Sequence, residues 1–111
     1  MPTPPGGSAA QIERRRSRRY PLDLVLEIEW GSSVLEGRVR DLSVHGMLVE
    51  LVDPLWIGAG FSARLKLDEP VAVECAVRRV EPGHAMGVSY VPANDESHVR
   101  ILALLKSLAE K

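Results

Sequence analysis

The stretch LDLVLEIEW, residues 22–30, alternates apolar and mostly acidic side chains without a break. Successive side chains of a β-strand point to opposite faces, so this alternation predicts a strand with one buried and one solvent-facing side. The side that we expect to be buried consists of Leu22, Leu24, Leu26, Ile28 and Trp30. This stretch is the clearest strand in the chain, and the rest of the fold can be built outward from it.

Five more segments downstream have strand character. Turn-forming residues separate them, beginning with Gly31, Ser32 and Ser33 directly after the first strand. The segments are residues 34–40, 47–52, 61–67, 71–80 and 85–91. Six short strands with this spacing predict a mainly β fold, a small six-stranded antiparallel β-barrel over residues 22–91.

The periodicity of the apolar residues changes after Pro92. Val99, Leu102, Leu105 and Leu108 recur at three-residue steps, which is typical of one face of a helix. Asn94 or Asp95 can cap its first turn. We therefore expect a C-terminal α-helix over residues 94–110, packed on the barrel.

Length and composition favour one globular domain. The chain has 111 residues, of which 45% are hydrophobic and 26% charged, enough for one core but not two. Residues 1–12, rich in Pro, Gly, Ser and Ala, are expected to form a flexible tail before a domain at 13–111. The single cysteine, Cys75, excludes an internal disulfide and is expected to be a small buried side chain.

Several classes of function find no support in the sequence. No apolar run is long enough to span a membrane and no signal peptide precedes the domain, so we expect a cytoplasmic protein without membrane insertion. His45, His84 and His98 lack the mutual spacing of metal ligands, and Ser43 lacks a recognisable general base. We expect no enzyme activity, no metal and no cofactor.

Positive charge is concentrated just before the first strand. Five of the six residues 14–19 are arginines, and without them nine basic residues face fifteen acidic ones. A guanidinium is permanently charged and offers a fork of donors that fits phosphate, carboxylate or the O6/N7 edge of guanine. The arginine segment, residues 14–19, is therefore a candidate anion site, which we expect to become ordered when a ligand binds.

A second group of polar residues lies between two predicted strands, in the sequence DLSVHG at residues 41–46. Asp41 can accept from guanine N1 and N2, Ser43 can donate to a phosphate or fix the turn, and Gly46 permits a close approach of the backbone. Asp and Ser followed by Gly are also ordinary turn residues, so this segment alone has a purely structural interpretation.

The two groups together resemble the PilZ domain family, whose pattern is RxxxR before the first barrel strand and (D/N)xSxxG one hairpin later. RxxxR falls on Arg15 and Arg19, followed by Pro21. The second motif is complete at residues 41–46, and GVSY at residues 87–90 resembles the last strand of the family. A register that uses Arg14 and Arg18 has the same spacing, although Pro21 argues against it.

This resemblance implies a receptor for cyclic di-GMP, a second messenger with two guanines and two phosphates in a ring. It implies that Arg15 and Arg19 grip phosphate and guanine, while the base is held by Asp41, Ser43 and Gly46. Arg14 resembles the RRxxxR variant, which implies two stacked ligand molecules per chain. The expected output is a ligand-ordered arginine segment that signals to an effector protein, whose identity the sequence does not give.

Two other functions remain open on the sequence alone. One is a protein-interaction module of the same fold that does not depend on a nucleotide. The other is nonspecific nucleic-acid binding through the arginine segment, against which the acidic remainder and the few aromatic residues argue. Arg78 and Arg79 are left out of the expected site, because neighbouring residues of a regular strand point to opposite faces.

Overall fold

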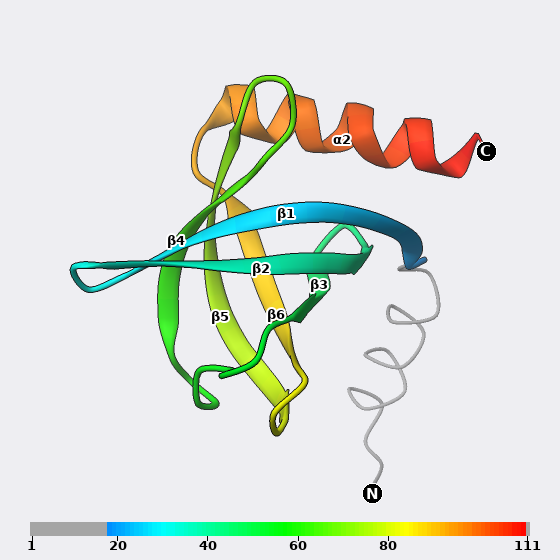
Figure 1. Cartoon of the computed structure of the whole chain (residues 1–111). Coiled ribbons are helices and arrows are strands. Elements are labelled where there is room, and N and C mark those ends of the chain that lie inside the picture. The colour runs from blue at the N-terminus through cyan, green and yellow to red at the C-terminus, as the bar shows by residue number, and fades with distance from the viewer. Residues whose placement is uncertain (1–17, 111) are drawn as a thin grey trace, which may run out of the picture.

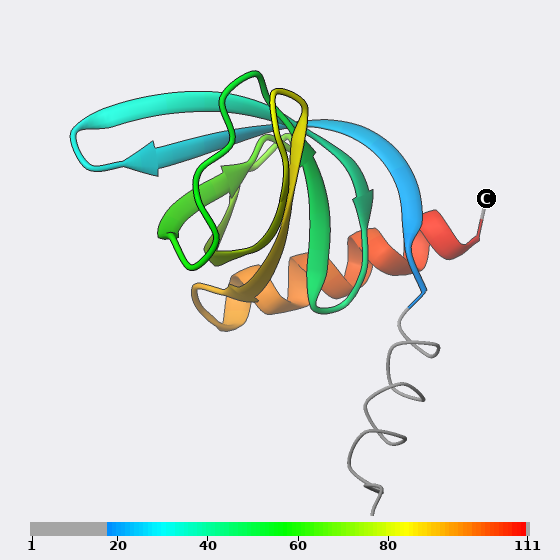
Figure 2. The same cartoon turned by 90° about the horizontal axis from the view of Figure 1, so that it is seen from below.

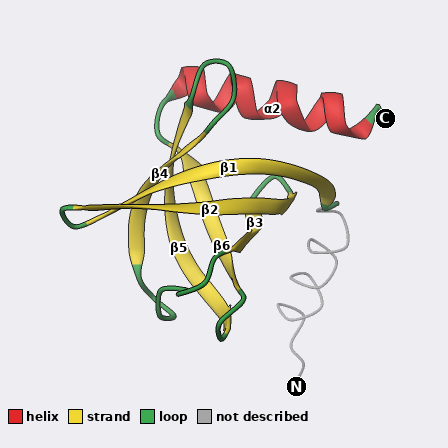
Figure 3. Ribbon diagram, viewed as in Figure 1, coloured by secondary structure: helices red, strands yellow, loops and turns green. Residues whose placement is uncertain are grey.

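The computed structural model describes residues 18–110, which form six strands and one helix (Figures 1 and 3). The elements are β1 (Tyr20–Trp30), β2 (Ser33–Leu42), β3 (Gly46–Glu50), β4 (Gly60–Leu65), β5 (Val71–Glu81), β6 (Ala85–Pro92) and α2 (Asp95–Ala109). Each of the six strands predicted from the alternation is present, and so is the C-terminal helix.

The six strands form a closed antiparallel barrel in the order β1-β2-β3-β6-β5-β4, with β4 returning to pair with β1. This confirms the predicted fold class. The alternation in β1 works as expected at its centre, where Leu26 and Ile28 are fully buried. Their neighbours Val39, Val49 and Val73 come from other strands, so the core lies inside the barrel.

Helix α2 lies across one end of the barrel (Figure 1) and contacts β1, β5 and β6. Its N-cap is Asn94, whose side chain accepts a hydrogen bond from the Ser97 backbone N–H at 2.8 Å. Ile101 and Leu105 face the barrel and are buried. The helix therefore closes the core at this end. The three-residue repeat is met only in part, because Val99 and Leu102 are exposed and the buried face is formed by Ile101 and Leu105.

Three irregularities interrupt the pairing of the strands. Opposite Arg40, β1 carries the two residues Leu22 and Asp23, and Arg40 is in turn the extra residue of β2 against β3. On β5, Arg78 is an extra residue between the pairs Val77–Val88 and Arg79–Gly87. Such β-bulges bend a strand and redirect its side chains.

The bulge on β5 corrects the expectation that Arg78 and Arg79 point to opposite faces. Both side chains are exposed, while Val77 is fully buried. The extra residue breaks the two-residue period at this point, so both guanidinium groups lie on the outside of the barrel.

Trp30 and Cys75 were both expected to be buried. Trp30, expected inside, is only half-buried, and its ring meets that of Trp56 edge-on, with centroids 5.0 Å apart and an interplanar angle of 82°. Cys75 is buried as expected, and this burial raises the pKa of its thiol to about 12. The thiol is therefore protonated at neutral pH and behaves as a small apolar group.

Candidate functional site

The two sequence motifs meet on the outer surface of the barrel. Arg19 Nη1 donates to Asp41 Oδ1 at 2.7 Å, although the two residues are 22 positions apart. The contact follows from the β1–β2 register, in which Tyr20 pairs with Leu42 and Pro21 with Asp41. The Arg19 side chain is 54% exposed and that of Asp41 26%, so both remain accessible to a ligand.

The turn between β2 and β3 is held by Ser43. Its hydroxyl donates to the Gly46 carbonyl and accepts from the Gly46 N–H, both at 3.1 Å. The Ser43 backbone N–H donates to the same carbonyl at 2.8 Å. Ser43 is buried, so its side chain fixes the turn that carries Gly46 and is already engaged before any ligand binds.

Gly46 supplies the flat floor beside Arg19. A Cβ atom at this position would lie 3.1 Å from the Val88 carbonyl oxygen and 3.7 Å from Arg19 Nη2. The glycine is therefore required by the close approach of β3 and β6 rather than by a special backbone conformation. Its missing side chain leaves the Arg19 guanidinium room above the sheet.

Tyr90 on β6 supports this turn from inside the molecule. Its hydroxyl donates to the Ser43 carbonyl at 2.6 Å, and the residue is 4% exposed. Burial, helped by the nearby Cys75 thiol, raises the pKa of Tyr90 above its usual value. The hydroxyl therefore stays protonated and remains a donor throughout the physiological pH range.

We expect Tyr90→Phe to lower the free energy of unfolding by about 1–2 kcal/mol, because it leaves the buried Ser43 carbonyl without its donor. Urea titration followed by circular dichroism measures this change. Tyr20→Phe is the matched control, since the Tyr20 hydroxyl has no partner among residues 18–110 and its loss should change stability by less than about 0.5 kcal/mol. Equal effects of both substitutions would contradict the role assigned to the Tyr90–Ser43 hydrogen bond.

The outer surface continues from the motifs across β6 to β5. Gly46 pairs with Ser89 of β6, and Arg78 Nε donates to Ser89 Oγ at 3.0 Å. Beside this row, Arg79 lies over Gly87, where a Cβ atom would be 3.4 Å from Arg79 Nε. The same surface thus carries guanidinium groups from Arg19, just before β1, and from β5.

A hollow of about 310 Å³ lies next to the motifs. The start of β1 and the C-terminal half of α2, which border it, lie near each other in Figure 2. Its lining residues are Arg18, Tyr20, Val44, Leu105, Lys106 and Ala109. Arg18 directly precedes Arg19, and Val44 directly follows Ser43. Residues next to both motifs therefore share this hollow with α2.

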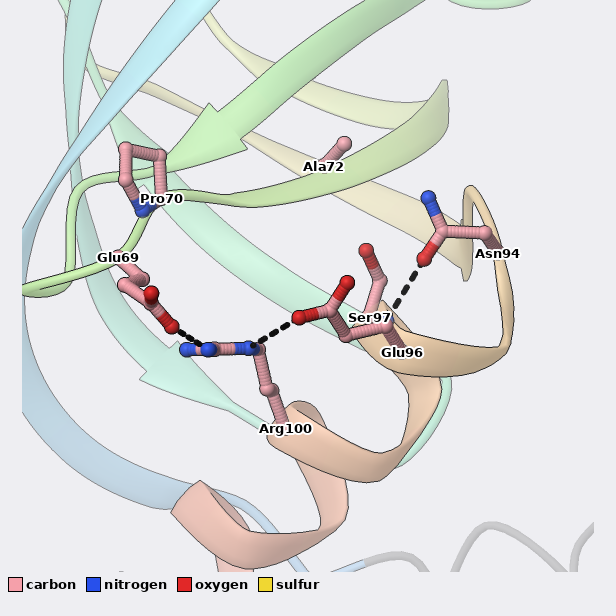
Figure 4. A pocket seen from close by; sticks show the side chains of 7 residues that line it. All are labelled: Glu69, Pro70, Ala72, Asn94, Glu96, Ser97 and Arg100. Atoms are coloured by element: carbon pink, nitrogen blue, oxygen red, sulfur yellow. Dashed lines mark hydrogen bonds and ion pairs between the residues drawn. The ribbon is translucent and has the colours of Figure 1, made fainter.

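A second hollow, of about 350 Å³, lies between the β4–β5 loop and the first two turns of α2 (Figure 4). The guanidinium of Arg100 lies between the carboxylates of Glu69 and Glu96 there, and its Nε is 3.5 Å from Glu96 Oε2. Asn94 is occupied with capping the helix. The charged groups that line this hollow pair with one another and hold α2 against the barrel. The hollow is therefore a poorer candidate for the binding site.

The structure describes four of the six expected site residues. Arg19, Asp41 and Gly46 come together, and Ser43 lies beneath them in the turn. Arg14 and Arg15 lie outside the described residues. The sequence did not indicate Tyr90 and Ser89 as supports of the site, although both belong to the GVSY string that resembles the family.

Neither a metal centre nor a membrane span emerges from the described part of the chain. Within residues 18–110, no group of three or more His, Cys, Asp or Glu side chains is placed to hold a metal ion. The helix in the same range is too short and too polar to cross a membrane.

The model of the PilZ domain family matches residues 13–107 of this sequence. The chain belongs to the PilZ domain family. The match includes both motifs, all six strands and most of α2. PilZ domains are ligand-binding regulatory domains rather than enzymes. No curated protein is similar enough in sequence to count as a relative.

Solved structures share the fold. The Bacillus subtilis inhibitor of motility MotI/DgrA is 19% identical, with a TM-score of 0.70 over 88% of this PilZ domain chain and 53% of that one. MrkH, a transcription regulatory factor dependent on cyclic di-GMP, is 17% identical, with a TM-score of 0.74 over 88% and 52%. The PilZ domain of YcgR from Escherichia coli, solved with cyclic di-GMP, is 18% identical, with a TM-score of 0.65 over 87% and 92%. The chain therefore spans about half the length of the first two proteins.

Proposed function

We propose that this PilZ domain is a cytoplasmic receptor for cyclic di-GMP that transmits the binding event to an effector protein. The observation that carries the proposal is the contact between Arg19 and Asp41, which joins the two family motifs above the flat floor at Gly46. The structures of YcgR with cyclic di-GMP and of MrkH support the same ligand class.

The chemistry of this pair suits the ligand. A carboxylate has two oxygens and accepts several hydrogen bonds, so Asp41 can keep Arg19 on Oδ1 and accept from guanine N1 and N2 on Oδ2. Arg19 Nη2 lies over Gly46 and can donate to a phosphate oxygen. In this arrangement Asp41 selects guanine, because adenine has no donor at N1. Ser43 holds Gly46 in position through the hydrogen bonds of the turn.

The output of binding is mechanical. Arg15 and the rest of the arginine segment close over the ligand and become ordered, which changes the surface next to Arg18 and α2. The hollow lined by Arg18 and Lys106 connects the two. Helix α2 also carries the exposed apolar residues Val99 and Leu102, which provide a contact for the effector.

Calorimetric titration with cyclic di-GMP tests the receptor function, with GTP and single-stranded RNA as controls. We expect saturable heat with cyclic di-GMP and much weaker binding of both controls. Equal affinity for RNA would favour a nucleic-acid-binding barrel instead. Absence of heat with all three would favour an interaction module that is independent of nucleotides.

We further expect two cyclic di-GMP molecules to bind per chain, and Arg14→Leu to reduce this number to one while binding is retained. Two stacked molecules bring four phosphate charges together, and the additional guanidinium of Arg14 offsets part of their repulsion. Titration at protein concentrations well above the dissociation constant gives the stoichiometry directly. Saturation of the wild-type chain at one ligand would contradict the second binding position.

A further inference from the structure

Strand β5 presents a guanidinium group that belongs to neither motif. The bulge at Arg78 puts this side chain on the outside of the barrel, with Nε donating to Ser89 Oγ. No carboxylate within residues 18–110 pairs with it. Carboxylates in the same range do pair with Arg19, Arg38, Arg40, Arg64, Arg79 and Arg100. Arg78 is thus held in position without being neutralised.

The position of Ser89 relates Arg78 to the motifs. Ser89 pairs with Gly46 across β3 and β6, and Gly46 lies beneath Arg19 Nη2. Because β5 is two strands away from β3, the backbone of Arg78 is about 10 Å from that of Gly46 at the usual spacing of strands. Its side chain reaches back over β6 to Ser89 and so shortens this gap. Gly46 therefore has an arginine on each side of it along the sheet, Arg19 on one side and Arg78 on the other.

We propose that Arg78 is a ligand-binding residue at the far side of the cyclic di-GMP site, and that Ser89 is its positioning residue. This inference rests on the receptor function proposed above. A cyclic dinucleotide has two bases and two phosphates, so it extends beyond the part that Arg19 and Asp41 hold. With Nε fixed on Ser89, the two terminal nitrogens of Arg78 donate to a pair of acceptors, either guanine O6 and N7 or two phosphate oxygens.

The test begins with Arg78→Ala, titrated with cyclic di-GMP by calorimetry beside the wild type. We expect the dissociation constant to rise roughly ten- to a hundredfold, the effect of losing one bidentate contact. Arg64→Ala is the matched control, because Arg64 is also exposed but pairs with Glu27 and Glu29 on the other side of the barrel. It removes the same charge and should leave the affinity unchanged.

Arg78→Lys separates the two possible acceptors. Lysine keeps the charge but lacks the fork, so affinity near the wild type identifies a phosphate, whereas affinity as low as that of Arg78→Ala identifies the guanine edge. Thermal unfolding followed by circular dichroism shows that each variant is folded, as expected for a surface side chain. An unchanged affinity of folded Arg78→Ala would overturn the proposal.

The role of Ser89 is tested by a double-mutant cycle. Ser89→Ala should weaken binding roughly threefold when Arg78 is present, the usual effect of one hydrogen bond, and should have no further effect in the Arg78→Ala background. Additive losses would instead show that Ser89 acts on the ligand by itself and would overturn its role as a positioning residue.

The two proposals fail in different ways. If the wild-type protein binds cyclic di-GMP and Arg78→Ala binds it equally well, the receptor function stands and only the role of Arg78 is rejected. If the wild type shows no binding at all, both are rejected.

Discussion

Arg19→Ala and Asp41→Ala each lower the affinity for cyclic di-GMP by at least about a hundredfold, or 2.7 kcal/mol. Each removes one half of the contact that joins the two motifs, and with it a charge-assisted hydrogen bond that we propose for the ligand. The thermal midpoint of the free protein stays nearly unchanged, because an ion pair at this level of exposure contributes little to stability. Calorimetry and thermal unfolding measure the two effects separately.

The matched controls are Arg38→Ala and Asp23→Ala. Arg38 Nη2 is 2.8 Å from Asp23 Oδ1, and the two side chains are 51% and 53% exposed. This pair therefore reproduces the charge change and the exposure of Arg19 without being part of either motif. Equal losses of affinity at both pairs would show that net charge alone governs binding, and unfolding of the Arg19 or Asp41 variants would show that these residues serve the fold.

Gly46→Ala lowers both ligand affinity and stability. The added methyl group lies 3.1 Å from the Val88 carbonyl oxygen, so β3 must shift away from β6 at a cost of about 1–3 kcal/mol. It also lies 3.7 Å from Arg19 Nη2, in the space that we propose for the ligand. We expect the dissociation constant to rise tenfold or more, about 1.4 kcal/mol.

Gly60→Ala provides the comparison for this substitution. Gly60 begins β4, and a Cβ atom there would lie 3.7 Å from the Cys75 carbonyl oxygen, which is an ordinary contact. We expect its free energy of unfolding to change by less than about 0.5 kcal/mol, with ligand affinity unchanged. If the two alanine variants behave alike in urea titration and calorimetry, the close approach at Gly46 does not set the geometry of the site.

The sequence predicts the strands well because their signal is local. Alternation of apolar and polar residues, interrupted by Gly, Pro and Asp, places each strand boundary within two residues of its observed position. The choice of Asn94 or Asp95 as the N-cap was left open, and the structure selects Asn94. These features depend only on neighbours in the chain, which a single sequence contains.

The bulge at Arg78 could not be predicted from the local sequence pattern. A rule with a period of two residues assigns Arg78 and Arg79 to opposite faces, whereas one unpaired residue on β5 puts both outside. Nothing in the local pattern RRV announces the extra residue, because the bulge arises from the register with β6. The error removed both arginines from the expected site.

The hydrogen bond that supports the β2–β3 turn could not be predicted for a similar reason. The Tyr90 hydroxyl finds the Ser43 carbonyl across 47 positions of the chain, and such a pairing follows only from the closed barrel. The motif pattern indicated Ser43 as a ligand contact or a turn residue, and the described hydrogen bonds show its use in the turn. Direct contact between Ser43 and the ligand remains a prediction.

Closure of the barrel also limits how this domain can associate with other proteins. Each of the six described strands has a partner on both sides, so no strand offers a complete free edge for backbone pairing. An effector peptide therefore has little opportunity to join the sheet as an additional strand, a common mode of peptide recognition elsewhere. We expect recognition to depend instead on side chains outside the sheet's hydrogen-bonding pattern, such as those of α2, where substitutions can alter the choice of effector without disturbing the sheet.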